Sequence, residues 1–353
     1  MADVSVASVE AADSVVLTEV GRDCYAATLT GHPTVGAIVG VDGIVLIDGG
    51  ETPAVAAQVG EALRRITDKP VRKVVFTHYH ADATLGAAAF DGVEILSSSL
   101  TRGLMSDRGR QNRELIANRR TAGGETVPFT AMRPVWPTVT FGSSLSLWSG
   151  EREIRVMHLG RGHTLGDVVV WVPDAGVMFA GDLVVSGELP DLADGYLRQW
   201  PVTLDRIAAF RPTALVPGRG MPATSTLAVE ELLGSMRQML GSFVQATDDF
   251  YDDRTLPAVH QRVRDGLANV APDVGTSRSF DALLLVGTSR ALAEADGREQ
   301  PDIWSVERER QAQDKLANLG PALPDLTMAD LVAADLAAEM GDIVREDSDR
   351  QDG

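Results

Sequence analysis

Three residues with metal-binding side chains alternate along one short stretch of the sequence. His78, His80 and Asp82 directly follow residues 71–76, an apolar run rich in β-branched residues that predicts a buried strand. A neutral imidazole suits zinc, and a carboxylate suits a second zinc or a harder cation. A strand end is a favourable place for ligands because the sheet fixes where the loop begins. The spacing of two histidines is weak evidence by itself, since side chains at alternate positions often just share one face.

Three later segments strengthen this interpretation. His163 lies in the segment GHTLGD, between two glycines that let the backbone turn sharply and approach an ion closely. Asp182 follows a predicted strand in the segment FAGD. The last segment, PGRG, contains Arg219.

The four segments, in this order, resemble those of the metallo-β-lactamase-fold superfamily. That group includes class B β-lactamases, glyoxalase II-like thioesterases, lactonases and persulfide dioxygenases. The resemblance covers about Val15 to Met221. It implies an α/β fold, a four-layer αβ/βα sandwich with the active site at the loop edge between two sheets.

The resemblance also implies roles for individual positions. His78, His80 and His163 match the three histidines of the first metal site, and Asp182 matches a residue that bridges the two metals in glyoxalase II-like members. Asp82 matches a ligand of the second site. Two further residues are expected beside the ligands, in supporting positions: Asp48, in the family's early acidic turn, and Thr164.

The second metal site departs from the family pattern at two positions. Ala83 stands where a second-site histidine is often found, and Arg219 stands where the PGHG motif supplies another. Two neighbouring carboxylates repel each other unless a positive charge lies between them. We therefore expect the Arg219 guanidinium to occupy the second-metal space and to pair with Asp82, Asp182 or both.

The resemblance implies a metal-dependent hydrolase that activates water to attack a small ester, thioester, lactone or amide carbonyl, and the altered second site predicts one zinc ion per chain. Asp82 would act as general base, and Arg219 would stabilise an oxyanion or hold a substrate carboxylate. An alternative is an Fe(II) persulfide dioxygenase-like enzyme that uses His78, His163 and Asp182. A third hypothesis is a metal-poor binding or regulatory protein on the same scaffold.

The alternation of strand-like and helix-like segments indicates how these residues are positioned. Strands are predicted at 35–39, 44–47, 71–76, 93–96, 138–141, 144–148, 153–159, 167–172, 176–179 and 214–216, and helices at 54–66, 83–90, 101–120 and 202–210. Helical patterns then dominate, at 227–246, 258–269, 280–295 and 328–344. We predict a metallo-β-lactamase-like domain over residues 1–225, a helical C-terminal extension over 226–345 and a disordered tail over 346–353.

The composition of the chain excludes several kinds of site and disfavours several kinds of partner. The chain has 353 residues, a net charge of −18 and a single cysteine, Cys24, which excludes an internal disulfide and a cysteine-rich zinc site. Such a charge disfavours a nucleic-acid partner. No apolar run is long enough for a membrane helix, and residues 1–16 lack the pattern of a secretory signal, so we expect a cytoplasmic protein without a membrane partner. The expected partners are a small-molecule substrate and a second copy of the chain, packed through the C-terminal helices.

Two further groups of polar residues are predicted near the site. Tyr196 and Arg198, just after the Asp182 motif, are candidates for substrate binding. The segment 101–120 is rich in arginine, which could draw in an anionic substrate, but a solvated helix face is the favoured interpretation. Its arginines are Arg102, Arg108, Arg110, Arg113, Arg119 and Arg120.

Overall fold

The structure is a computed structural model that describes residues 15–122, 124, 129–249, 253–276 and 279–317. The described residues up to Gln313 belong to one compact unit. Within the described ranges, every helix is too short or too polar to cross a lipid bilayer.

The first sheet has seven strands, which lie across the sheet in chain order. The first four form an antiparallel meander, and β4 to β7 are parallel neighbours. The parallel pairs are connected by helices, as their geometry requires. The strands are β1 (Val16–Gly21), β2 (Cys24–Thr28), β3 (Val35–Val39), β4 (Ile44–Ile47), β5 (Val71–Val75), β6 (Glu94–Ser98) and β7 (Val139–Phe141), and the connecting helices are α1 (Pro53–Arg64), α2 (Ala81–Thr84), η1 (Leu85–Ala89), α3 (Ser99–Ala122) and η2 (Phe129–Ala131).

The second sheet has five strands in the order β12-β11-β10-β9-β8. Its strands are β8 (Ser144–Ser149), β9 (Arg152–Met157), β10 (Val169–Val172), β11 (Val177–Val185) and β12 (Ala214–Arg219). The β11–β12 pair is parallel and is connected by α4 (Trp200–Ala209). All nine residues of β11 are buried, which explains its continuous apolar sequence around Gly181 and Asp182.

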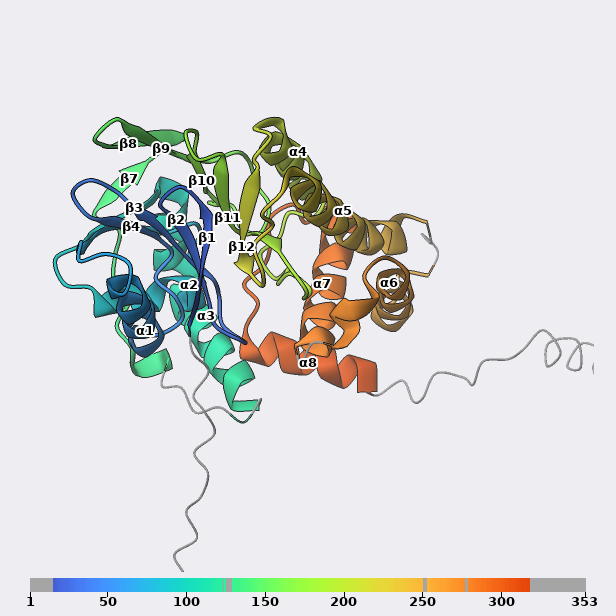
Figure 1. Cartoon of the computed structure of the whole chain (residues 1–353). Helices are drawn as coiled ribbons and strands as arrows, with labels where there is room; N and C mark the ends of the chain where they lie inside the picture. The colour runs from blue at the N-terminus through green and yellow to red at the C-terminus, as the bar shows by residue number, and fades with distance from the viewer. Residues whose placement is uncertain (1–14, 123, 125–128, 250–252, 277–278, 318–353) are drawn as a thin grey trace, which may run out of the picture. The chain divides into compact units, whose positions relative to one another are not determined.

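The two sheets pack face to face, with helices on both outer faces (Figure 1). Ile38, Ile47 and Val75 of the first sheet share a buried cluster with Val170 and Phe179 of the second. A separate cluster packs α1 against the outer face of the first sheet, and another packs α4 against the second. The predicted four-layer αβ/βα sandwich is therefore confirmed.

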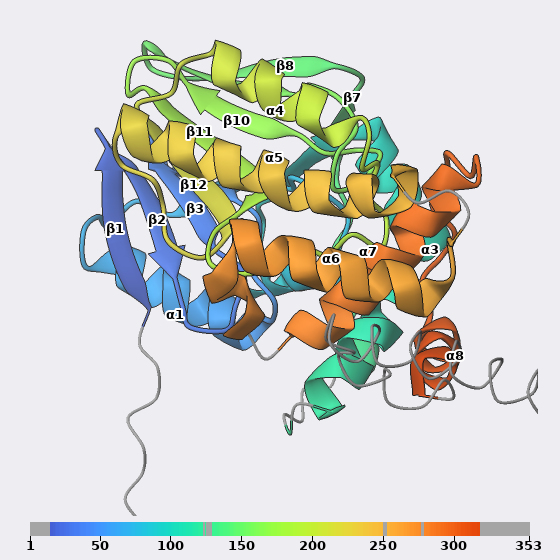
Figure 2. The same cartoon turned by 90° about the vertical axis from the view of Figure 1, so that its right-hand side faces the viewer.

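The C-terminal helices are α5 (Thr226–Asp248), α6 (Leu256–Val270), η3 (Pro272–Thr276), α7 (Phe280–Ala295) and α8 (Val306–Ala317). Helix α5 lies beside α4 on the second sheet, and α6 and α7 pack against α5 (Figure 2). Phe243 of α5 and Leu284 of α7 are fully buried in the same cluster as Trp200 of α4. The apolar face of α7 is thus covered within the chain, while the boundary near residue 225 and the homodimer stay predictions.

The element predictions differ from the structure at a few places. The strands β1 and β2 were not predicted, because they are only six and five residues long. The helix α8 was not predicted, because its sequence is predominantly polar. The helix predicted at 83–90 is a single turn of α-helix followed by a 3₁₀ helix. The predicted helix at 328–344 and the tail at 346–353 lie outside the described residues.

The packing of α7 on α5 predicts the effect of a Gly287→Ala substitution. A Cβ atom at Gly287 would lie 2.4 Å from Cε1 of Phe243 and 2.8 Å from Cδ1 of Leu192. Such overpacking costs about 1–3 kcal/mol of unfolding free energy, measurable by urea denaturation.

The matched control is Gly234→Ala in α5, where a Cβ atom meets nothing within 4 Å. Alanine there should stabilise the helix by roughly 0.5–1 kcal/mol. Equal effects of the two substitutions would contradict the packing described here.

Candidate metal centre

Three buried histidines converge at the edge between the two sheets. His78 and His80 lie in the loop between β5 and α2, and His163 lies in the loop between β9 and β10. The ring centroids are 4.9 Å apart for His78 and His80, 4.8 Å for His78 and His163, and 4.7 Å for His80 and His163. One nitrogen from each ring lies within 4.8 Å of the others, so the three can hold one metal ion.

The outer nitrogen of each ring has a hydrogen-bond acceptor. Nε2 of His80 lies 3.0 Å from Oδ2 of Asp194, and Nδ1 of His163 lies 3.0 Å from the carbonyl oxygen of Asp191. Nδ1 of His78 lies 2.9 Å from the hydroxyl of Thr77. These acceptors hold the ring protons outward, so the inner nitrogens keep their lone pairs for a metal.

Asp48 supports His78 through Thr77, as the predicted supporting position requires. Its carboxylate accepts hydrogen bonds of 2.7 Å from both the amide and the hydroxyl of Thr77. Because that hydroxyl donates to Asp48, it accepts from Nδ1 of His78. Asp48 adopts a left-handed conformation (φ 62°), which aspartate tolerates better than most residues. The parallel pairing of β4 with β5 places this turn beside the histidine loop.

The inner side of the cluster fits a metal ion. Nε2 of His78 is buried and has no hydrogen-bond partner among the described residues, and such an orphaned atom is costly unless a ligand satisfies it. Burial holds the pKa of His78 well below its usual value, so the ring is neutral, as metal binding requires. Burial acts against protonation of His80 too, but the Asp194 carboxylate outweighs it and raises the pKa of His80.

Arg219 occupies the space beside the histidines, where the sequence places it. Its Nη2 donates to Oδ2 of Asp82, and its Nε lies 3.4 Å from Oδ2 of Asp182. A third carboxylate, Oε1 of Glu188, lies 3.7 Å from the same Nε. The guanidinium therefore pairs with both predicted carboxylates, and it leaves up to two uncompensated negative charges next to the histidines.

Two glycines allow this close approach. A Cβ atom at Gly218 would lie 2.0 Å from Oδ1 of Asp182, and one at Gly181 would lie 2.4 Å from Oγ1 of Thr77. Gly181 also has a φ of 53°, which glycine adopts without strain. Burial disfavours the ionised form of Asp182, but His78 and Arg219 outweigh it and lower the pKa of Asp182 to about 2.

The remaining predicted residues either support the loop that carries a histidine or have partners outside the histidine cluster. Thr164 donates its amide and its hydroxyl to the carboxylate of Asp167, which fixes the loop that carries His163. Tyr196 is 2 % exposed, and Arg161 lies over its ring at 5.2 Å. Arg198 forms a surface ion pair with Asp248 of α5. These other partners argue against substrate binding by Tyr196 or Arg198.

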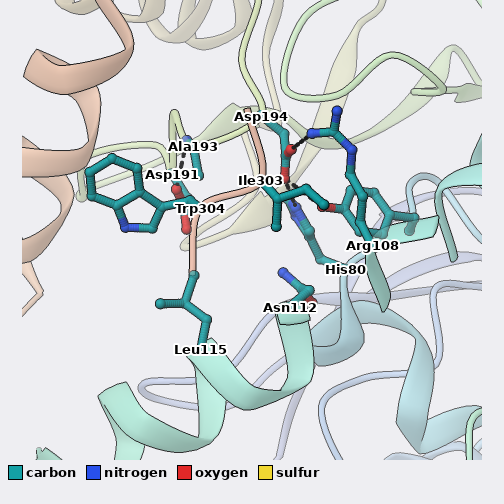
Figure 3. Close-up of a pocket in the computed structure, with 10 residues that line it drawn as sticks. His80, Arg108, Asn112, Leu115, Asp191, Ala193, Asp194, Ile303 and Trp304 are labelled. Carbon is teal, nitrogen blue, oxygen red and sulfur yellow. Dashed lines mark hydrogen bonds and ion pairs between the residues drawn. The ribbon is translucent and has the colours of Figure 1, made fainter. Parts of the chain in front are cut away.

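Several supporting residues were missed by the sequence analysis. Asp194, Asp191, Asp167 and Glu188 all contact a ligand, the ligand loop or Arg219. The acidic spacing of the segment DLAD, 191–194, was a usable signal, but it lies far from the histidine motifs in sequence. Figure 3 shows Asp194 between His80 and Arg108.

Comparison with known proteins identifies the family. The sequence model of the metallo-beta-lactamase superfamily matches residues 30–219, more than half of the chain. The chain belongs to the metallo-beta-lactamase superfamily. The matched residues include all three histidines and end at Arg219, so the candidate centre lies within the shared fold.

Individual relatives of this superfamily are distant. A linear primary-alkylsulfatase from Pseudomonas sp. is 24% identical over 236 residues, which are 56% of this chain and 43% of the alkylsulfatase. The match thus spans less than half of that relative. A metallo-beta-lactamase type 2 from Bacteroides fragilis is 23% identical over 255 residues, which are 68% of this chain and 91% of the lactamase.

Solved structures show the same fold. The metallo-beta-lactamase from Pontibacter korlensis has a TM-score of 0.50 and 22% identity, and the match covers 64% of this chain and 99% of that one. FIM-1 from Pseudomonas aeruginosa, solved in a mono-zinc form, has the same TM-score and identity over 64% of this chain and 96% of that one. The uncovered third of this chain has no counterpart in those matches.

The hydrogen-bond chain through Thr77 predicts a measurable loss of stability in Thr77→Val. Valine removes the hydroxyl that accepts from His78 and donates to Asp48, which leaves buried polar groups unpaired. The expected cost is about 1–3 kcal/mol of unfolding free energy. Thr121→Val, which removes an exposed hydroxyl of α3, is the control and should change it by less than about 0.5 kcal/mol. Equal, small changes in both variants would show that the chain through Thr77 adds nothing.

Proposed function

We propose that this protein is a mononuclear zinc hydrolase of a small ester-type or amide substrate. The observation that carries the proposal is the convergence of three inner histidine nitrogens, one of which is buried and has no hydrogen-bond partner in the part of the chain that the structure describes. Three protein ligands that leave one position open are typical of a catalytic zinc ion, and three histidines are one of the sets that provide this. His78, His80 and His163 would hold the ion, which supplies Lewis acidity that makes water nucleophilic near neutral pH.

The chain's own groups beside that ion have complementary roles in the proposal. Asp82, whose side chain is 14% exposed, would orient the attacking water and accept its proton. None of the described residues accepts a hydrogen bond from Nη1 of Arg219. That donor would bind the substrate oxygen on which negative charge develops. Asp82 and Asp182 in turn hold the guanidinium in place.

The arrangement favours zinc hydrolysis over iron-dependent oxygen chemistry. A facial triad of His78, His163 and Asp182 would leave the third histidine idle, yet His80 lies within the cluster and its Nδ1 is 2.8 Å from Nε2 of His163. Asp182 lies 3.8 Å from His163 and is shared with Arg219. A metal-poor binding protein would have no need of an unpartnered buried nitrogen on His78.

The proposed reaction and the names of two relatives together define the substrates to be screened. Two relatives are named for an alkyl sulfatase and a β-lactamase activity, so sulfate esters and β-lactams belong in the screen with esters, thioesters and lactones. All of these substrates carry a polarised oxygen that one cation and one guanidinium would stabilise. A small-molecule substrate, rather than a polymer, remains our proposal.

Elemental analysis of protein purified without a chelator or a histidine tag tests the metal centre. We expect about one zinc ion per chain, because the three histidines form one ligand set. His163→Ala should lose the zinc together with any esterase activity, and His260→Ala, on α6, is the control that should retain both. Iron in place of zinc would favour the dioxygenase, and no metal after reconstitution would leave only the binding-protein hypothesis.

The Arg219→His variant tests whether the guanidinium replaces a second metal. Histidine would remove the cation and offer a third ligand beside Asp82 and Asp182, so zinc content should rise from about one to about two ions per chain. Arg237→His, which breaks only a surface ion pair with Asp205, is the matched control and should stay at about one. An unchanged stoichiometry in Arg219→His would refute the replacement.

A further inference from the structure

Two of the three histidines are held by a single short segment. The residues 191–194, DLAD, follow β11 and present a backbone carbonyl to His163 and a carboxylate to His80. The inner nitrogens of the same two rings lie 2.8 Å apart. Any shift of this segment would therefore move two rings, or change where their protons sit, at once.

The side chain of Asp194 is buried, and both of its carboxylate oxygens have hydrogen-bond partners. Its Oδ2 accepts from the Tyr79 hydroxyl at 2.5 Å and lies 3.0 Å from Nε2 of His80. Its Oδ1 accepts from Nη1 of Arg108 at 2.6 Å (Figure 3). The side chains of Asp194, His80 and Arg108 are only 9%, 7% and 17% exposed. Water therefore competes weakly for these hydrogen bonds.

Asp191 is anchored just as firmly. Its carboxylate pairs with Nη1 of Arg119 at 2.8 Å and accepts from the amide of Ala193 at 3.0 Å. The same guanidinium contacts Glu309, whose carboxylate also accepts from the indole of Trp304 at 2.8 Å. Asp191 can thus present its carbonyl oxygen to His163 in one fixed orientation.

The anchors come from two parts of the chain that lie outside the histidine motifs. Arg108 and Arg119 belong to α3. Their further partners are Pro301, which precedes α8, and Glu309, which lies in α8. Nη2 of Arg108 donates to the carbonyl of Pro301 at 2.8 Å. Arg290 of α7 donates to the carbonyl of Gly195, directly after the segment, at 2.7 Å.

This arrangement corrects the expectation for the arginine-rich helix. Arg110 is solvated, with 71% of its side chain exposed. Arg108 and Arg119 are instead turned inward, at 17% and 20%, and each pairs with an aspartate of the 191–194 segment. Because their charges are neutralised in this way, neither forms an open basic patch for a substrate.

We propose that Asp194 is a positioning residue that fixes the tautomer of His80, and that α3 and the C-terminal helices hold it in place and so set the metal affinity. The inference rests on the proposed zinc centre. A carboxylate only accepts hydrogen bonds, so it keeps the ring proton on Nε2 and leaves the Nδ1 lone pair facing His163. The helical part of the chain is then a component of the metal centre, although it supplies no ligand.

Asp194→Asn tests the tautomer directly. Arg108 donates to Oδ1, so it selects the amide oxygen there and turns the amide nitrogen toward His80. That nitrogen donates, which moves the ring proton onto Nδ1, the atom that should bind the metal. We expect zinc affinity to fall about 10- to 100-fold, measured by titrating zinc into chelator-treated protein with a chromogenic indicator. Asp205→Asn, at a surface ion pair, is the control that should leave it unchanged.

The double variant Asp194→Asn with Arg108→Met separates the tautomer from a general loss of structure. Without the guanidinium, the amide can rotate and offer its oxygen to His80, so the double variant should bind zinc more tightly than Asp194→Asn alone. A purely structural role predicts the reverse, since the second substitution removes a further contact to Pro301.

The outcomes distinguish the two proposals. If the wild-type protein binds zinc and Asp194→Asn binds it equally well, the positioning role is refuted and the zinc centre stands. If the double variant binds more weakly than the single one, the tautomer argument fails. If the wild-type protein binds no zinc at all, the zinc centre fails and the positioning role fails with it.

Discussion

The placement of three protons is the constraint on which this site depends. Each histidine of the cluster has two ring nitrogens, and a metal can use the inner one only while the proton stays on the outer one. In a buried cluster, water does not supply the acceptors, so the chain must supply one for each ring. It does so with three different groups: the hydroxyl of Thr77, the carboxylate of Asp194 and the carbonyl of Asp191.

These acceptors explain why so much of the chain is tied to so small a site. Asp48 reaches His78 from the turn after β4, and the parallel β4–β5 pairing fixes that distance. The segment 191–194 is in turn clamped by α3 and by residues up to Glu309. Helices α5, α6 and α7 share their core with the second sheet, and Arg290 of α7 also donates a hydrogen bond to the carbonyl of Gly195, directly after the segment 191–194.

The convergence of the three histidines was predictable from the sequence, but most of their hydrogen-bond partners were not. The histidines and Asp82 and Asp182 stand in short motifs at strand ends, where local sequence and local structure coincide. The pairing of Arg219 was predictable because a cation replaces a ligand between two carboxylates. Asp194 and Arg108 lie 86 positions apart and meet only after the chain has folded, so the acidic segment DLAD does not reveal in the sequence which residues it contacts. The inward turn of Arg108 and Arg119 was missed for the same reason, since a helix periodicity does not reveal which polar face is covered.

Arg219 has a consequence that goes beyond its contacts. A second metal ion would be in exchange with the surroundings, and its occupancy would follow the supply of that metal. A guanidinium is covalently part of the chain and stays charged at any physiological pH, so this half of the site is complete as soon as the protein folds. The fraction of active protein would then depend on a single ion, bound at the three histidines. At low occupancy, that fraction would be proportional to the concentration of the ion.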